Sequence, residues 1–270
     1  MSLTVRQRAS IVLRRFWLLQ LADQLLYFFL RFRLRKSNSI FRCKNPDVRI
    51  PPASILYDIL GTCDLTGFFQ SGCEHANALA GIINKHQPSG LLQILEWGCG
   101  PGRVLQYLQS PSESVWELFG ADYNPRTIDW CRANLPQIRF FLNDLAPPIP
   151  AEAASFDVIY CISVFTHLSE SLHYQWIEEI MRLLKPGGLF IGTFHGERYR
   201  DHLEPEEQRK FDSGSLVVRD RIREGKKNFA AYHADDFVQS LLSSFTTVWS
   251  QEEPGFQQTV WCGIKGTEHV

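Results

Sequence analysis

Short apolar runs alternate with amphipathic segments from about residue 90 onward. Five of these runs are typical of buried strands. They cover residues 92–97, 115–121, 138–143, 156–163 and 188–194. The segments between them have helical periodicity, and we expect helices over residues 102–109, 125–134 and 169–184. Strands that alternate with helices over this length predict an α/β fold with a parallel sheet covered on both faces.

The segments on either side of this alternation follow other patterns. Pro51 and Pro52 introduce a helix with the sequence ASILYDIL, a glycine-containing loop follows, and a second helix covers about residues 74–86. Near the end of the chain, two apolar runs separated by Pro254-Gly255 predict an antiparallel hairpin. We divide the chain into a helical arm (1–45) and a domain (46–270) that comprises an entry segment (46–90), the α/β core (91–195), a charged segment (196–231) and the last helix with the hairpin (232–270).

Composition places the chain among ordinary globular proteins, with 44% apolar residues, 21% charged residues and a net charge of −1. The net charge does not favour a general polyanion binder, but the charges are unevenly distributed. Residues 1–36 hold eight basic side chains and a single acid, Asp23, which leaves 20 basic and 28 acidic residues in the rest. A basic arm before an acidic body indicates an anionic partner for the arm.

The arm contains the apolar stretch FWLLQLADQLLYFFL, which has arginines on both sides. A membrane span needs about 20 apolar residues, so this stretch is too short, and no small-residue cleavage site follows it. As a helix over residues 11–34 it has an apolar face from Trp17 to Phe32 and a polar face that includes Asp23. Such a helix binds a membrane interface, or it docks on its own domain or on the second subunit of a homodimer.

The seven cysteines form no Cys-x-x-Cys pair and no Cys/His spacing of the kind that binds metal. Several lie within apolar runs, as Cys161 does. We therefore expect buried free thiols, no metal site and a cytoplasmic location, at the inner face of the membrane if the arm binds lipid.

A glycine-rich turn, EWGCGPGRV, follows the first strand of the predicted sheet. A doubly wound sheet binds ligands at this point, because backbone N–H groups and a helix N-terminus face the crevice there. The dinucleotide pattern Gly-x-Gly-x-x-Gly requires glycine where this chain has Arg103, so the turn does not match it. Glu96 precedes the first glycine by two positions, which suits a ligand that carries a positive charge and no phosphate.

The turn and four later segments resemble the motifs of class I S-adenosylmethionine (SAM)-dependent methyltransferases, of the bacterial small-molecule or sugar type. These segments are ILEWGCGPGRV, LFGADYNP, FFLNDLAPPIP, FDVIYCISVFTHLSE and LLKPGGLFIGTFHG, in this order. The resemblance covers about residues 51–266. It implies a Rossmann-like, seven-stranded, mostly parallel sheet in the order 3-2-1-4-5-7-6, with the last strand antiparallel. It also implies SAM as the cofactor.

The resemblance assigns ten residues to cofactor binding. They are Glu96, Gly98, Gly100, Gly102, Asp122, Tyr123, Asn143, Asp144, Ile162 and Val164. Glu96 would orient the turn and attract the ammonium group of the cofactor, or cap a helix. Asp122 would hold both ribose hydroxyls, or cap the helix at Pro125. Asp144 would accept a hydrogen bond from the adenine amine, or form a turn. Arg103 is expected to be a solvated helix residue, with contact to the cofactor carboxylate as the alternative.

Methyl transfer from a sulfonium is an in-line displacement, so a base is required only when the acceptor group is protonated. The candidate bases are His167 and His195, which follow the fourth and fifth strands; either could instead be structural. The charged segment suits a cover over a polar, hydroxyl-rich substrate, or it is solvated surface. A nucleobase amine is not expected, because the chain has Cys-Ile-Ser-Val where enzymes for that acceptor carry Asp/Asn-Pro-Pro-aromatic.

We therefore expect a SAM-dependent methyltransferase for a small polar acceptor, a hydroxyl of a carbohydrate or glycolipid intermediate, with no nucleic acid partner. One alternative is methylation of a lipid or protein at the membrane surface. The other is a non-catalytic scaffold that binds the cofactor, against which the intact glycines and Asp122 argue.

Overall fold

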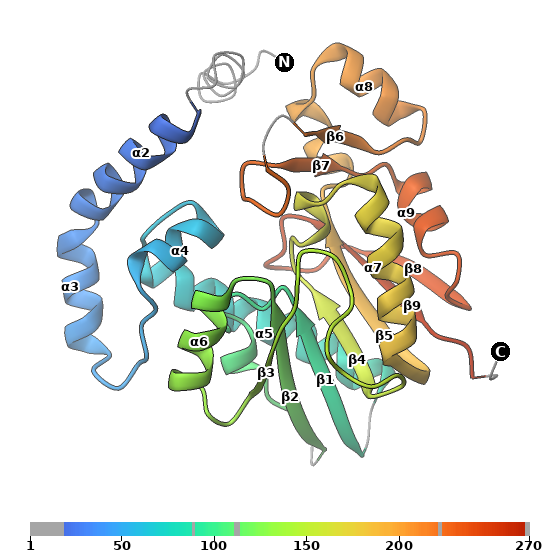
Figure 1. The fold of residues 1–270 in the computed structure, drawn as a ribbon, viewed down its shortest axis with the longest axis horizontal. Coiled ribbons are helices and arrows are strands. Elements are labelled where there is room, and N and C mark those ends of the chain that lie inside the picture. Colours follow the sequence, from blue (N-terminus) through green and yellow to red (C-terminus); the bar gives the residue numbers. More distant parts are fainter. Residues whose placement is uncertain (1–18, 88–89, 111–113, 221–222, 268–270) are drawn as a thin grey trace.

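A seven-stranded sheet forms the centre of the computed structural model, which describes residues 19–87, 90–110, 114–220 and 223–267 (Figure 1). Its strands are β1 (Leu91–Trp97), β2 (Val115–Asp122), β3 (Arg139–Leu142), β4 (Phe156–Cys161), β5 (Leu184–Phe194), β8 (Thr247–Gln251) and β9 (Thr259–Ile264). They lie in the order β3-β2-β1-β4-β5-β9-β8. The first five are parallel, and β9 is antiparallel to both of its neighbours. The expected strand order and reversed last strand are confirmed, because β9 and β8 take the places of strands 7 and 6.

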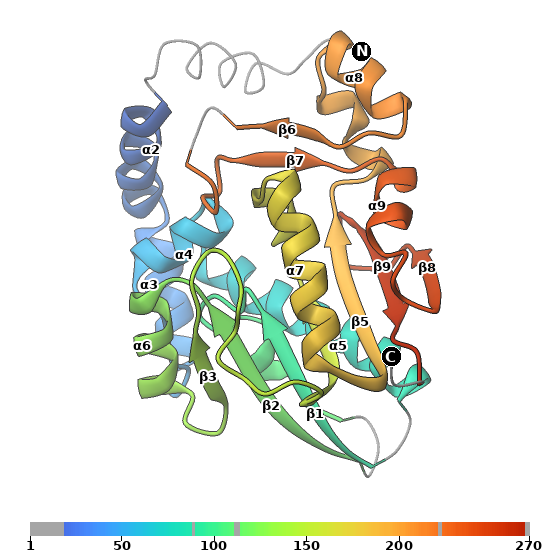
Figure 2. The same ribbon diagram turned by 45° about the vertical axis from the view of Figure 1, so that its right-hand side comes forward.

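Helices cover both faces of this sheet (Figure 2). On one face, α7 (Glu170–Leu183) and α9 (Asp235–Leu241) pack against Ile159 and Cys161 of β4. On the other, α5 (Leu65–His86) and α6 (Pro125–Asn134) pack against Val158 and Tyr160. Successive side chains of a strand point to opposite faces, so a strand buried on both sides is apolar throughout. This is why the central strands appear in the sequence as mainly apolar runs.

Helix α5 is longer than expected, since the predicted loop before residue 74 belongs to it. The Asp64 carboxylate starts the helix by accepting hydrogen bonds from the N–H groups of Thr66 and Gly67, at 3.1 and 3.2 Å. Gly72 lies inside the helix, and a Cβ there would come within 2.2 Å of the Arg103 carbonyl oxygen. The glycine that suggested a loop is therefore needed for close packing between α5 and the glycine turn.

The helix expected over residues 102–109 is wrong. The structure has only a short 3-10 helix, η1 (Leu105–Tyr107), preceded by Gly102 in the left-handed region with φ +67°. Leu108 is already extended, and the sequence continues to Pro111, which disfavours helical conformation in the residue before it. Too few residues are left between these two limits for a full α-helix. The other expected strands and helices of the core differ from the structure only at their ends.

The described part of the arm consists of α2 (Leu19–Arg33) and α3 (Arg35–Lys44), which lie along one side of the domain (Figure 1). Trp17 and Leu18 of the expected apolar face lie outside the described residues. No described helix is both long enough and apolar enough to cross a membrane.

One face of the arm packs on the entry segment, which begins with α4 (Ala53–Leu60). The Asn38 amide donates to the Cys63 carbonyl oxygen at 2.7 Å, and the Phe41 ring stacks on Phe69 with centroids 5.2 Å apart. The arm thus docks on its own domain, as one of the alternatives had it.

The charged segment folds into η3 (Glu197–His202), α8 (Pro205–Asp212) and the two-stranded sheet of β6 (Val217–Arg219) and β7 (Ala230–Tyr232). These elements lie beyond the carboxyl ends of the parallel strands, at the top of Figure 2. They enclose a small core of their own, in which Leu203, Phe211 and Val217 are buried. The segment is therefore folded structure rather than plain solvated surface.

All seven cysteines are free thiols. Five are buried as expected, but Cys43 and Cys73 are exposed, so the expectation of buried thiols does not hold for these two. Both lie on helices of the arm and entry segment, where one helix face remains in solvent.

Replacing Asp64 by Ala should lower the free energy of unfolding by about 1 kcal/mol, because two N–H groups at the start of α5 lose their acceptor. Urea denaturation monitored by circular dichroism measures this change. Asp64→Asn is the matched control, since the amide oxygen still accepts and should restore most of the loss. Equal stability of Asp64→Ala and the parent would contradict the assigned cap.

Candidate functional site

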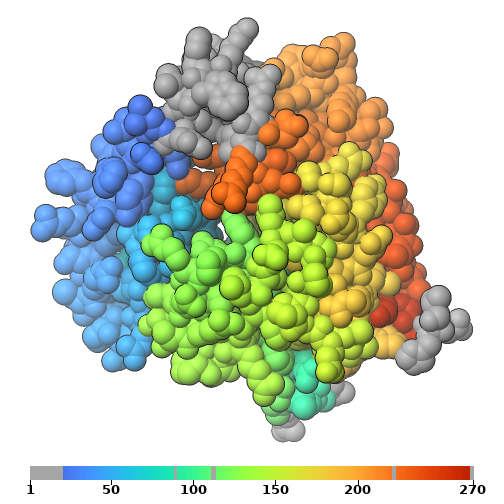
Figure 3. All heavy atoms as spheres, viewed as in Figure 1, coloured from blue at the N-terminus to red at the C-terminus, as the bar shows by residue number. Residues whose placement is uncertain are grey.

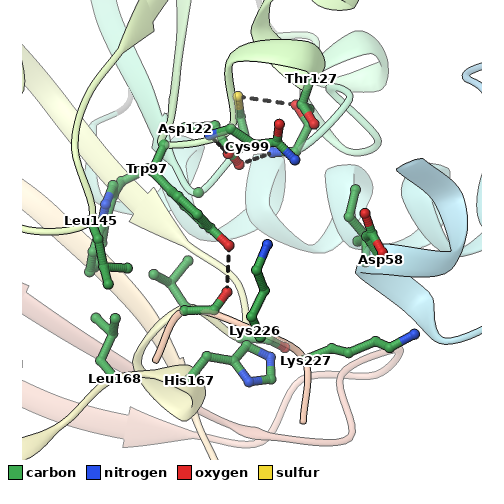
Figure 4. A pocket seen from close by; sticks show the side chains of 18 of the residues that line it. Asp58, Trp97, Cys99, Asp122, Thr127, Leu145, His167, Leu168, Lys226 and Lys227 are labelled. Carbon is green, nitrogen blue, oxygen red and sulfur yellow. Dashed lines mark hydrogen bonds between the residues drawn. The ribbon is translucent and has the colours of Figure 1, made fainter. Parts of the chain in front are cut away.

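A cavity of about 470 Å³ opens at the carboxyl ends of β1, β2 and β4 (Figure 4). In the space-filling view a hollow lies between the arm, the 223–228 stretch and the surface of β2 and its neighbours (Figure 3). Nine of the ten residues expected to bind the cofactor line the cavity. They are Glu96, Gly98, Gly100, Asp122, Tyr123, Asn143, Asp144, Ile162 and Val164. The fold thus brings motifs from four separate segments to one wall.

The glycine turn is bound closely to the end of β2. The N–H groups of Gly98 and Cys99 both donate to the Ala121 carbonyl oxygen, at 2.8 and 3.0 Å. Gly98 and Gly100 have φ values of +75° and +51°, a region that favours glycine. A Cβ on Gly98 would also lie 2.3 Å from a methyl group of Val164, so both backbone conformation and space require glycine there.

Gly102 does not line the cavity. It turns the chain with a positive φ, and a Cβ on it would lie 2.7 Å from a methyl group of Leu135 at the end of α6. The structure therefore places Gly102 in the packing behind the turn, away from the cavity.

The Asp122 carboxylate faces the cavity from the end of β2 (Figure 4). One oxygen accepts from the Gly100 N–H at 3.0 Å and the other from the Asn124 N–H at 2.8 Å. Burial raises the pKa of Asp122, and these N–H groups oppose that shift. Helix α6 is capped by Asn124, whose side chain accepts from the Arg126 N–H, so Asp122 is not the cap. Each carboxylate oxygen can accept a further hydrogen bond, which leaves capacity for a ligand hydroxyl.

Asn143 carries an unsatisfied acceptor in the cavity wall. Its amide nitrogen donates to the Asp144 carbonyl oxygen at 2.6 Å, which fixes the orientation of the amide. Its side-chain oxygen is then buried without a hydrogen-bond partner among the described residues. A buried acceptor of this kind indicates a ligand donor, such as an amine or hydroxyl. Asp144 itself is exposed, so Asn143 supplies the buried acceptor next to it.

Glu96 and Arg103 are two buried ionisable side chains behind the glycine turn. Glu96 is 4% exposed and accepts a hydrogen bond from the Tyr160 hydroxyl at 3.1 Å. Burial raises the pKa of Glu96 to about 8, against the opposing effect of the Arg103 guanidinium. The expectation of a solvated Arg103 is wrong, because its guanidinium is buried and donates to Ser71 Oγ and His75 Nδ1, both at 3.1 Å. Both side chains line the cavity.

His167 presents an unprotonated nitrogen in this site. Its Nδ1 lies 2.9 Å from the Phe229 carbonyl oxygen, which can only accept, so Nδ1 carries the hydrogen and Nε2 the lone pair. Burial lowers the pKa of His167, which keeps the imidazole neutral at pH 7. The ring lies at the cavity beside Lys226 (Figure 4).

His195, the other candidate base, lies outside the cavity. Its Nδ1 donates to the Ala231 carbonyl oxygen at 3.1 Å, and its ring packs on Tyr199 with centroids 4.1 Å apart. The side chain packs between the end of β5, η3 and β7, so the structure does not bring His195 to the cavity with His167.

A loop formed by residues 223–229, here called the roof loop, closes the cavity on the side opposite the glycine turn. The Tyr123 hydroxyl donates to the Gly225 carbonyl oxygen at 2.7 Å, and the Gly225 N–H donates to the His167 carbonyl oxygen at 2.9 Å. Lys227 forms an ion pair of 3.1 Å with Asp23 of α2. Sequence reasoning assigned no role in the site to the arm or to individual residues of this loop. Opposite charges in distant segments give no local signal of pairing.

Comparisons with known proteins find similarity to methyltransferases. Residues 94–188 match the family model described as a methyltransferase domain. The chain is 33% identical over 147 residues to a Schizosaccharomyces pombe protein named tRNA N(3)-methylcytidine methyltransferase trm140; the match covers 51% of this chain and 47% of that protein. The chain therefore spans about half the length of that relative.

Two solved structures share the fold. Streptomyces venezuelae DesVI has a TM-score of 0.56 at 14% identity, covering 81% of this chain and 100% of that one. The 1,6-didemethyltoxoflavin-N1-methyltransferase of Burkholderia thailandensis, solved with 1,6-didemethyltoxoflavin and S-adenosylhomocysteine, has a TM-score of 0.51 at 17% identity, covering 82% and 93%. Residues 94–188 are thus similar to methyltransferase domains, and the strand order is that of the class I, Rossmann-like methyltransferase fold, for which SAM is the expected cofactor. The acid at the end of β2, the glycine turn and the unsatisfied Asn143 oxygen fit that cofactor.

Replacing Asp122 by Ala should weaken SAM binding by about 1–3 kcal/mol, because charge-assisted hydrogen bonds are lost. Isothermal titration calorimetry measures the difference. Asp144→Ala is the matched control from the same wall, and we expect a smaller loss because that side chain is exposed. Equal affinity of Asp122→Ala and the parent would overturn the role of this carboxylate.

Glu96 should make the folded protein less stable as the pH rises. Its folded-state pKa of about 8 exceeds its usual value of 4.5. Protonation of Glu96 therefore stabilises the folded state fully below pH 4.5, and this contribution is lost as the pH rises towards 8. Compared with Glu96→Gln, the parent should lose unfolding free energy over this window, at most about 1.4 kcal/mol per pH unit. Urea denaturation of both proteins at several pH values tests this. Parallel stability curves would show that Glu96 is ionised in the folded state.

Proposed function

We propose that this chain transfers the methyl group of SAM to a hydroxyl of a small polar acceptor, with a carbohydrate or glycolipid intermediate as the substrate class. The observation that carries the proposal is the His167 Nε2 lone pair in the cofactor cavity. A hydroxyl must lose its proton during methylation, and a neutral imidazole held beside it is a suitable base.

The part of the cavity near the roof loop supports a polar acceptor. It is lined by both charged and neutral hydrogen-bonding side chains from three segments of the chain. These are Asp23, Asp58, Arg223, Lys226, Lys227 and Asn228. Such a mixture of donors and acceptors suits a ligand with many hydroxyl groups better than an apolar one.

Different residues of the chain would bind the cofactor, remove the proton and exclude water. SAM supplies an electrophilic methyl group on its sulfonium. Asp122, Asn143 and the glycine turn would hold the cofactor, with Arg103 available to its carboxylate. His167 Nε2 would take the proton of the acceptor hydroxyl, and the Phe229 carbonyl oxygen would stabilise the resulting imidazolium through Nδ1. The roof loop would limit the access of water, which strengthens these electrostatic interactions.

Nucleic acid is a second candidate acceptor because of the relative named as a tRNA methyltransferase. Against it, the body after residue 36 has 28 acidic and 20 basic residues. A lipid or protein at the membrane surface is a third, supported by the exposed face of the arm. Under the leading proposal the protein acts in the cytoplasm or at the inner face of the membrane.

Replacing His167 by Ala should lower kcat about 10²–10⁴-fold while the SAM dissociation constant stays nearly unchanged. His195→Ala, the matched control, should keep kcat close to that of the parent. Because the His167 pKa lies below its usual 6.5, activity should persist at pH 6.5 and fall only at lower pH. Unchanged kcat in His167→Ala would show that no base is needed from this residue.

The acceptor class can be tested directly with methyl-labelled SAM. The full chain would be incubated with extracted lipid, with a soluble glycan pool and with tRNA. We expect label in the glycan or glycolipid fraction and none in tRNA. Label in tRNA alone would replace the leading proposal by the second candidate, and label in the lipid fraction without sugar would favour the third.

A further inference from the structure

The outer face of the arm exposes a stripe of large apolar side chains. They are Leu21, Leu25, Phe28, Phe29, Phe32 and Ile40, and Phe32 is 79% exposed. Positions 21, 25, 28 and 32 are spaced by three or four residues, which places them on one side of α2. The opposite side, with Asp23 and Tyr27, faces the domain through Tyr57. Large apolar side chains gathered on one exposed face mark an interaction surface.

A basic groove borders this stripe. It runs between the arm and the entry segment, which contributes Ala53 and Cys63. On the arm it is lined by Phe28, Phe32 and three exposed arginines, Arg31, Arg35 and Arg42. None of the ion pairs formed by the described residues involves these three arginines. Helices α2 and α3 contain a single acid, Asp23, and its carboxylate is turned towards Lys227 on the domain side. The outer face therefore combines exposed apolar area with unneutralised positive charge.

We propose that this outer face of α2 and α3 docks on an anionic lipid bilayer. Phenylalanine and leucine side chains enter the boundary between headgroups and acyl chains, and the arginines bind lipid phosphates. The leucines and the isoleucine of the stripe favour a membrane over RNA, since aliphatic side chains offer bases no stacking surface, whereas the phenylalanines suit either partner. The inference concerns the arm alone and does not depend on the acceptor or on catalysis.

Docking in this orientation would place the methyltransferase cavity just behind the membrane-bound helix. Asp23 lines the cavity from the inner side of α2, and the outer side of the same helix carries the apolar stripe. The Asp23 contacts with Lys227 and Tyr57 fix the helix against the roof loop and α4. An amphiphilic acceptor would then need to move only about the thickness of one helix, ~10 Å, from the membrane surface.

The test is co-sedimentation of the full chain with vesicles of phosphatidylglycerol and phosphatidylcholine, and with vesicles of phosphatidylcholine alone. We expect binding to the anionic vesicles that weakens with added salt. Arg31→Gln/Arg35→Gln should bind about 30-fold less tightly, at ~1 kcal/mol for each arginine. Arg209→Gln/Lys210→Gln on α8 removes two exposed basic side chains elsewhere and should bind like the parent.

A second pair of variants tests the apolar stripe. Phe28→Ala/Phe32→Ala should lose at least tenfold in vesicle affinity, whereas Leu91→Ala/Val115→Ala, exposed on the far end of the sheet, should not. Circular dichroism and SAM titration would verify that all variants fold. Equal vesicle binding by the parent and both arm variants would overturn the proposal. So would tRNA binding that needs only the arginines, or a dimer in light scattering that Phe28→Ala/Phe32→Ala dissociates.

Discussion

The attachment of the glycine turn to the end of β2 is the interaction on which the rest of the site depends. Two successive N–H groups of the turn share the Ala121 carbonyl oxygen, and the Gly100 N–H goes to the Asp122 carboxylate. This bonding is compatible only with the left-handed backbone of Gly98 and Gly100. It fixes the Asp122 carboxylate, the glycine turn and the buried Glu96 on one wall of the cavity. A side chain on Gly98 would collide with Val164 and separate the motifs of β1 and β4.

The roof loop connects this wall to His167, the proposed base. It binds His167 twice, through the Gly225 N–H to the backbone and through the Phe229 carbonyl oxygen to the imidazole. The loop therefore sets the tautomer of the proposed base as well as its position. Glu224 adds an acceptor for the Ser169 N–H at the start of α7. A displacement of the loop would therefore change both the shape of the proposed acceptor site and the protonation of His167.

The two sides of helix α2 have different surroundings. Its inner side supplies Asp23 to the cavity, where the ion pair with Lys227 holds the roof loop. Its outer side leaves Phe28 and Phe32 in solvent, which a helix in a self-contained domain would bury. A membrane surface would cover the outer side without disturbing the inner contacts. The arm would then orient the cavity towards the interface, in agreement with an amphiphilic acceptor.

The sequence by itself determined the strand order of the sheet and most of the residues that line the cavity at the glycine turn. Buried strands and crossover helices leave periodic apolar patterns, and the motifs lie at strand ends that parallel topology brings to one edge. Tertiary structure decided what local pattern does not encode. The early start of α5 depends on the Asp64 cap and on Gly72 packing against the turn. Burial of Arg103, the separation of His195 from the cavity, and the contact of Asp23 with Lys227 each join segments far apart in the chain. Such contacts depend on where the folded elements meet, so they cannot be predicted from the periodicity of a single segment.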